Sequence, residues 1–254
     1  MSFLALASPL LALLGVLLAA LGVVGARWGW FSPLAGFALF AFAGLLLCGF
    51  GALVSGAIGI WRTRLSAHRD GAAQAWAGFL SGALLLVVLF LLAPSGGAPP
   101  IHDLTTDLDD PPRFSALLHD EENRGRDLDY PHGPPDTPQQ QRQHYPDLGS
   151  IVLAEPPMAA LRRAVQAAES LGWEVVAVRE PAAGDQAGSD IEPGFEALDR
   201  TTVFRFADDI VVRVRDEIAR SRIDVRSTSR VGQSDLGANA ARIRAFRTAL
   251  EASP

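Results

Sequence analysis

The chain of 254 residues contains no lysine and a single cysteine. All 22 of its basic residues are therefore arginine, a bias that a GC-rich genome explains most simply. The cysteine, Cys48, lies within a long apolar run, so no intrachain disulfide can stabilise the rest of the chain. The polar part of the chain must rely on its own hydrophobic core or on a bound ion.

Charged residues are also missing from three long apolar runs: Phe3 to Val24, about Leu34 to Ile60, and Ala72 to Leu92. About 20 apolar residues suffice to cross a hydrocarbon core of about 30 Å. Backbone groups in lipid must form hydrogen bonds within their own segment, so we expect three transmembrane helices in the lipid bilayer. Because no Asp, Glu, Lys, Arg or His lies inside them, ion transport by these helices alone is not expected.

The arginines around these runs predict a direction of insertion. Arg62, Arg64 and Arg69 lie in the short connection between the second and third runs. The positive-inside rule places this connection in the cytoplasm and everything after Pro94 outside it. In a bacterium, the prediction is a multi-pass protein of the inner (cell) membrane with a periplasmic or extracellular domain. The first run has no basic residues before it, so we expect a retained anchor rather than a cleaved signal peptide.

Small residues recur every four positions in two of the predicted helices, at Gly51, Ser55 and Gly59 and at Gly78 and Gly82. Such stripes allow helix backbones to approach closely. The spacing predicts packing within the chain, with a homo-oligomer through the same helix faces as the alternative.

The remainder of the chain is acidic. After Pro94 there are 18 arginines and 27 acidic residues, a net charge of −9, which argues against nucleic acid as a partner. We divide the chain into a transmembrane region (1–94), an extended acidic Pro-rich linker or strap (95–146) and a globular domain (147–254). A protein of the cell envelope or a small anionic ligand is the expected partner.

Hydrophobic periodicity predicts an α+β fold for residues 147–254. A helix is expected after Pro157, with Met158, Leu161, Val165 and Ala168 at helical spacing. Four strands and a last helix are expected to follow, over Trp173–Val178, Thr201–Phe206, Ile210–Val214, Ile223–Thr228 and Leu236–Leu250. The economical packing is an antiparallel sheet of about four strands with both helices on one face.

Two long stretches carry a family resemblance. They are "IHDLTTDLDDPPRF" (101–114) and "DVRSTSRVGQSDLGANAARI" (224–243), supported by "YPDL" (145–148), Trp173 and "FADDIVVRVR" (206–215). Over about residues 100–252 the chain resembles bacterial membrane-anchored members of the uncharacterised family called domain of unknown function 1499. The resemblance implies a fold and a location but no activity.

The second stretch contains the candidate ligand site. Strand alternation puts Asp224 and Arg226 on the face opposite the core, together with Arg213 and Arg215 of the neighbouring strand. Arginines, hydroxyls and the backbone at a helix start can bind a carboxylate or phosphate. The candidate ligand-binding residues are Arg213, Arg215, Arg226, Ser227, Ser229, Arg230, Asp235, Asn239 and Arg242. The structural alternative is that Asp199, Glu217 and Asp224 pair with these arginines while Asp235 caps the helix.

The first stretch offers possible metal ligands, namely His102, Asp103, Asp107, Asp109 and Asp110. Their spacing matches neither an EF-hand nor a zinc protease helix. Hydrogen bonds from Asp and Thr side chains to nearby backbone are the more common use of such residues, so we expect an added strand or a strap, with no metal and no cofactor.

No complete catalytic motif is present in the sequence. An acid–base pair would require His102 or Asp103 to approach Arg226 and Ser229. The first interpretation is therefore a binding or interaction module of the cell envelope. The alternative is a membrane-anchored hydrolase, or a binder of small anions, that uses the motif near residues 224–242.

Overall fold

The computed structural model describes residues 3–65, 71–93, 97–180, 192–218 and 220–252. The chain divides into two compact units. The first comprises residues 1–95 together with 201–206, and the second comprises residues 96–200 and 207–254.

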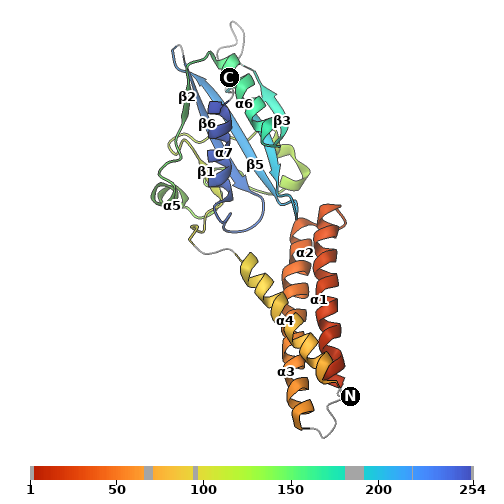
Figure 1. Ribbon diagram of the computed structural model, residues 1–254. Coiled ribbons are helices and arrows are strands. Elements are labelled where there is room, and N and C mark those ends of the chain that lie inside the picture. Colours follow the sequence, from red (N-terminus) through yellow and green to blue (C-terminus); the bar gives the residue numbers. More distant parts are fainter. Residues whose placement is uncertain (1–2, 66–70, 94–96, 181–191, 219, 253–254) are drawn as a thin grey trace. The chain divides into compact units, whose positions relative to one another are not determined.

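The first unit contains three helical spans (Figure 1). They are α1 (Phe3–Arg27), the continuous run of α2 (Pro33–Ala38), η1 (Leu39–Cys48) and α3 (Gly49–Leu65), and α4 (Ala72–Leu92). The spans have 25, 33 and 21 residues and are long and apolar enough to cross a membrane, as predicted. The η1 segment is a π-helix within the second span.

Small residues bring the three spans into close contact. A Cβ atom built on Gly78 would lie 1.7 Å from the Oγ of Ser8, and one on Gly82 would lie 2.5 Å from the backbone nitrogen of Leu53. The Ser8 hydroxyl also donates a hydrogen bond to the carbonyl of Ala52 at 3.0 Å. Gly78 and Gly82 therefore serve packing within the chain.

The second unit is built on an antiparallel sheet with the strand order β1-β6-β5-β4-β3, and β2 also pairs with β6. The strands are β1 (Asp103–Thr105), β2 (Ile151–Leu153), β3 (Glu174–Arg179), β4 (Gly194–Arg200), β5 (Ala207–Asp216) and β6 (Ser221–Ser229). The sequence predicted about four strands, and the sheet has six. The two additional strands, β1 and β2, have three residues each, too few to show an alternating pattern.

One predicted strand is misplaced. The expected strand Thr201–Phe206 lies in the connection between β4 and β5, and β4 occupies Gly194–Arg200 instead. β-Branched and aromatic residues favoured the wrong segment, whereas the charged residues of β4 looked like part of a loop. Residues 207–209, which lie between two of the predicted strands, belong to β5.

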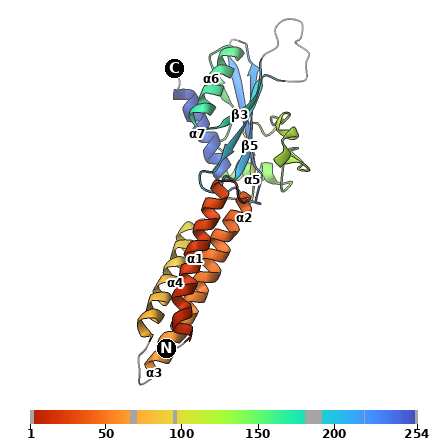
Figure 2. The ribbon, with the colours of Figure 1, turned by 90° about the vertical axis from the view of Figure 1, so that its right-hand side faces the viewer.

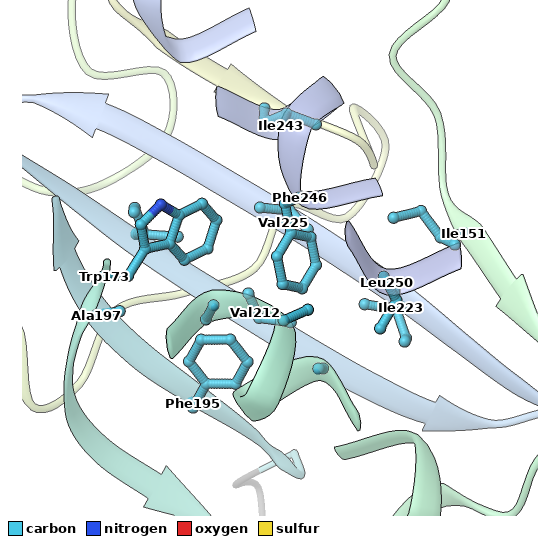
Figure 3. Packing of buried hydrophobic residues seen from close by; sticks show 14 of the residues in the cluster. Ile151, Trp173, Phe195, Ala197, Val212, Ile223, Val225, Ile243, Phe246 and Leu250 are labelled. Atoms are coloured by element: carbon cyan, nitrogen blue, oxygen red, sulfur yellow. The ribbon is translucent and has the colours of Figure 1, made fainter. Parts of the chain in front are cut away.

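Two helices, α6 (Pro157–Ser170) and α7 (Ala238–Ala252), lie together on one side of the sheet, as predicted (Figure 2). The core lies between them and the sheet (Figure 3). Trp173 stacks on Phe246 with ring centroids 5.1 Å apart, and Phe195 meets Phe246 edge to face. A further helix, α5 (Thr137–His144), is polar throughout, and the sequence did not predict it.

Residues 110–130, here called the strap, cover part of the other side of the sheet. They include the short 3₁₀ helices η2 (Leu117–His119) and η3 (Glu121–Asn123). A second, smaller cluster of buried side chains joins the strap to β4 and β5, and it consists of Phe114, Leu117, Leu128, Leu198 and Val211. The sequence left a linker or a strap as alternatives for residues 95–146; within this range, residues 110–130 contact the sheet through this cluster.

Candidate functional site

The alternation of β6 divides the candidate site residues between the two sides of the sheet. Ile223 and Val225 belong to the core below α6 and α7, so Ser227 and Ser229 point to the same helix side. Arg226 and Arg230 point to the strap side. The structure therefore brings the candidate residues together in two groups rather than one.

The polar side chains on the helix side form hydrogen bonds with one another. The Ser227 hydroxyl donates to Oδ1 of Asn239 at 2.7 Å, and Nδ2 of Asn239 donates to the Ser229 hydroxyl at 3.1 Å. Asp235 accepts hydrogen bonds from the backbone N–H groups of Gly237 and Asn239 at 2.9 and 2.7 Å. Asp235 thus caps the start of α7, as the structural alternative predicted.

Arg242 connects this group to the sheet. Its Nε lies 2.7 Å from Oδ2 of Asp199, its other nitrogens donate to Asp208 and to the Ser227 hydroxyl, and its side chain is 7% exposed. Burial raises the pKa of Asp208 above its ordinary value, although the neighbouring Arg242 guanidinium favours the charged form. The guanidinium nitrogens of Arg242 are all engaged in these contacts, which connect α7 to β4 and β5.

Arg226, on the strap side, forms a buried ion pair. Its Nε and one terminal nitrogen lie 2.9 Å from the two carboxylate oxygens of Asp103, and its side chain is 1% exposed. The guanidinium lies between the rings of Phe114 and Tyr130, 5.0 and 5.3 Å from their centroids, and donates to the carbonyl of Leu128 at 2.8 Å. Arg226 therefore holds β1 and the strap on the sheet.

The two sequence motifs meet at this ion pair. In the β1–β6 pairing Asp103 lies opposite Thr228, and the carbonyl of His102 accepts hydrogen bonds from the Ser229 backbone and from Asn239. His102 and Asp103 do approach Arg226 and Ser229, as the enzyme interpretation required. They are 6% and 0% exposed, however, so the contact is internal.

The possible metal ligands serve the fold in the same way. The carboxylate of Asp107 accepts hydrogen bonds from the backbone N–H groups of Asp109 and Asp110 at 3.2 and 3.1 Å, and it also pairs with Arg213 and Arg222. Among the residues that the structure describes, no group of three or more His, Cys, Asp or Glu side chains is arranged to hold a metal ion.

Arg230 fixes the far end of the strap. It lies 2.7 Å from Asp209 of β5 and 3.0 Å from Asp120 of the strap, and it also contacts Glu122. Arg126 approaches Asp209 from the strap at 2.8 Å. Arg230 is 5% exposed and fully engaged by these carboxylates, so a structural role accounts for it.

Arg213 and Arg215, from β5, border a cavity that none of the other candidates lines. One terminal nitrogen of Arg213 lies 3.0 Å from Asp107 and 2.9 Å from Asp224, and the other lies 3.2 Å from Glu192. The Nε of Arg215 lies 2.6 Å from Glu192. The carboxylates of Glu192 and of Asp110 thus each bridge the two guanidinium groups at the edge of the cavity.

The cavity has a volume of about 640 Å³ and is here called the arginine pocket. Its lining residues are Asp110, Pro111, Pro112, Arg113, Phe114, Ser115, Arg179, Glu192, Val211, Arg213 and Arg215. Four arginines and two acidic residues therefore surround it. The Nε of Arg213 is buried without a hydrogen-bond partner in the part of the chain described above. Arg113 is exposed and forms no hydrogen bond or ion pair within the described ranges.

Another lining arginine, Arg179, is anchored by a buried carboxylate. Glu196 is fully buried and accepts hydrogen bonds from the backbone N–H groups of Ser115, Ala116 and Leu117 at 2.9, 3.1 and 2.8 Å, and it pairs with Arg179. Burial alone would raise the pKa of Glu196, but these hydrogen bonds outweigh it and hold the pKa below its ordinary value.

Sequence reasoning missed Arg113, Arg179, Glu192 and Glu196. Arg113 was part of the recognised first motif, but its neighbours drew attention as metal ligands. Glu192 and Glu196 both lay outside the predicted strands, and Glu196 lay in the segment not recognised as β4. Had β4 been recognised, alternation would have placed Glu196, which lies opposite Val211, on the same face as Arg213.

The chemistry of the arginine pocket favours binding over catalysis. The Ser115 hydroxyl donates to Glu196 at 2.7 Å, but the lowered pKa of Glu196 makes this carboxylate a weak base. The guanidinium groups can instead hold a carboxylate or phosphate through charge-assisted hydrogen bonds.

Comparison with protein families gives a match to the family described as "Protein of unknown function (DUF1499)" over residues 103–250. The chain belongs to this family. The match covers the sheet, the strap and both helices that pack on the sheet. Neither the comparison with curated proteins nor that with solved structures gave a match. Function must therefore be argued from the site itself.

Proposed function

We propose that this DUF1499 protein is an integral membrane protein whose domain lies outside the cytoplasm and binds a small anionic molecule in the arginine pocket. The observation that carries the proposal is the Nε of Arg213, a buried donor without a partner in the described structure, at the wall of a cavity that Arg113 also lines. A buried donor without an acceptor costs about 1–3 kcal/mol, which a bound anion would recover.

Glu192 indicates how an anion would be held. Its carboxylate bridges Arg213 and Arg215, yet its side chain is 42% exposed, so solvent already competes for it. An external carboxylate or phosphate can take the same place and gain the exposed Arg113 as a further partner. Glu192 thus acts as an internal substitute for the ligand.

The location follows from the arginines between the second and third spans. Arg62, Arg64 and Arg69 favour the cytoplasm, which leaves the domain on the opposite side of the membrane. In a bacterium, this means the inner membrane and the periplasm or cell exterior. A small molecule or an envelope component would be the accessible anion there.

Calorimetric titration of the full-length protein in nanodiscs of zwitterionic lipid tests the proposal. Inorganic phosphate and sulfate are the probes, and we expect saturable binding that Arg113→Gln weakens about tenfold, because it removes one charge-assisted contact. Arg162→Gln is the matched control, since Arg162 of α6 is also exposed and has no ion pair within the described residues. Absent binding, or equal weakening by both substitutions, would refute the proposal.

A further inference from the structure

We infer that the ligand is an amphiphilic anion, with its charged group in the arginine pocket and a short apolar or aromatic group in a second cavity beside it. This inference rests on the proposed function and adds the class of molecule to it.

The second cavity has a volume of about 420 Å³ and is here called the aromatic pocket. Its lining residues are Pro111, Arg113, Phe114, Leu118, Leu128, Asp129, Tyr130 and Arg226. Pro111, Arg113 and Phe114 line both cavities. The two cavities therefore adjoin along one short stretch of the strap, and Arg113 is the charged residue at their boundary.

The aromatic pocket is not suited to a second anion. The guanidinium nitrogens of Arg226 already donate hydrogen bonds to Asp103 and to backbone carbonyls. Arg226 therefore has no pair of nitrogens left to bind an anion. Asp129, an exposed acid on the rim, would repel an anion. Among the described residues that line this cavity, Arg113 is the one cation without a hydrogen bond or ion pair, and it lines both cavities.

The walls of the aromatic pocket instead suit an apolar group. Phe114, Leu118 and Leu128 contribute side chains to it, and Leu118 is 49% exposed although Phe114 and Leu128 are buried. The Tyr130 hydroxyl is buried without a hydrogen-bond partner in the described structure, and an acceptor on a ligand could use it. Covering Leu118 would remove apolar surface from water, at about 25 cal/mol per Å².

The size of the two cavities limits the ligand. Each lies within the range of about 300–1,000 Å³ that is usual for small-molecule sites. A phosphate or carboxylate bearing one ring or a short chain has matching dimensions.

Phenyl phosphate and inorganic phosphate distinguish the two parts of such a ligand. We expect phenyl phosphate to bind the full-length protein about tenfold more tightly than inorganic phosphate, because its ring is buried against Phe114 and Leu118. In Leu118→Ser this preference should fall by about threefold or more, with unchanged affinity for inorganic phosphate. Val152→Ser is the matched control, since Val152 of β2 is 51% exposed and lines neither cavity.

The outcomes separate the inference from the proposed function. If neither probe binds, the proposed function itself fails. If inorganic phosphate binds through Arg113 but phenyl phosphate binds no more tightly, only the amphiphilic ligand is refuted. An equal loss of preference in Leu118→Ser and Val152→Ser would place the ring elsewhere and would overturn the inference as well.

Discussion

At the scale of single residues, the arginines of this domain differ in how much solvent reaches them. Arg226 and its partner Asp103 are almost completely buried, whereas Arg244 and Asp147 form a similar pair with side chains 46% and 49% exposed. Removing one partner of a buried pair leaves the other charge unpaired in a medium of low dielectric constant. The two pairs therefore predict different costs for the same substitution.

We predict that Arg226→Gln lowers the free energy of unfolding of the domain by about 3–5 kcal/mol, because Asp103 remains buried. Arg244→Gln should cost at most about 1 kcal/mol, since exposed pairs contribute little. Hydrogen exchange of the β6 amides in the full-length protein measures both values. Similar costs for the two variants would contradict the buried pair.

Substitution of Glu192 is predicted to strengthen anion binding rather than to weaken it. Glu192→Gln removes the internal carboxylate from Arg213 and Arg215, so affinity for inorganic phosphate should rise by about threefold or more. Calorimetry measures the change, and Glu174→Gln, an exposed acid on β3, controls for the loss of one negative charge. Unchanged or weaker binding in Glu192→Gln would show that Glu192 does not occupy the anion site.

For single residues, the sequence predicted which face of the sheet several side chains point to, but it did not predict all of their ion-pair partners. Alternation placed Arg213 and Asp224 on one face, and they pair there at 2.9 Å. It also grouped Ser227 with Arg226, although adjacent strand residues point to opposite sides. The partner of Arg226 could not be inferred, because Asp103 reaches it through a strand that pairs only in the folded chain.

At the scale of elements, one buried carboxylate anchors the part of the strap that leads into η2. Glu196 of β4 binds the backbone N–H groups of the turn before η2, and its pKa lies below the ordinary value of 4.5. A carboxyl group with a lowered pKa stabilises the folded state above its unfolded pKa, and this contribution is lost as pH falls through the folded pKa. The docking of the strap should therefore weaken in acid below about pH 4.5.

We predict that Glu196→Gln weakens the docking of the strap by about 2 kcal/mol or more and removes this part of the acid sensitivity, because the amide carries no charge. Hydrogen exchange at Ser115, Ala116 and Leu117 as a function of pH measures both effects. Exchange at these amides with the same rate and pH dependence in the variant and the parent protein would exclude Glu196 as the anchor.

The elements that the sequence predicted are those in which hydrophobic residues recur with a clear helical or strand periodicity. The three apolar spans, α6, α7, β3, β5 and β6 were recognised by hydrophobic spacing, and an added strand, as at β1, was one of two alternatives for residues 101–114; β2, β4 and α5 were not recognised. Of these, β2 has three residues, and α5 has no apolar stripe. Tertiary contacts, rather than local preference, establish such elements.

At the scale of the whole molecule, the arginine distribution predicts the side of the membrane. Periplasmic phosphatase fused after Pro94 should be active and a cytoplasmic fluorescent reporter at the same position should be dark, because Arg62, Arg64 and Arg69 retain their connection inside. Fusions within that connection should give the reverse pattern. A fluorescent reporter that is bright after Pro94 would place the domain in the cytoplasm.

The central claim is that the arginine pocket holds an anion, and anomalous diffraction from crystals of the full-length protein soaked in selenate tests it most directly. The account predicts a selenium peak inside the pocket, with selenate oxygens within hydrogen-bonding distance of Arg113 and of the Nε of Arg213 and with Glu192 displaced from Arg215. Selenium peaks found only outside the pocket, with Glu192 still bridging Arg213 and Arg215, would contradict it.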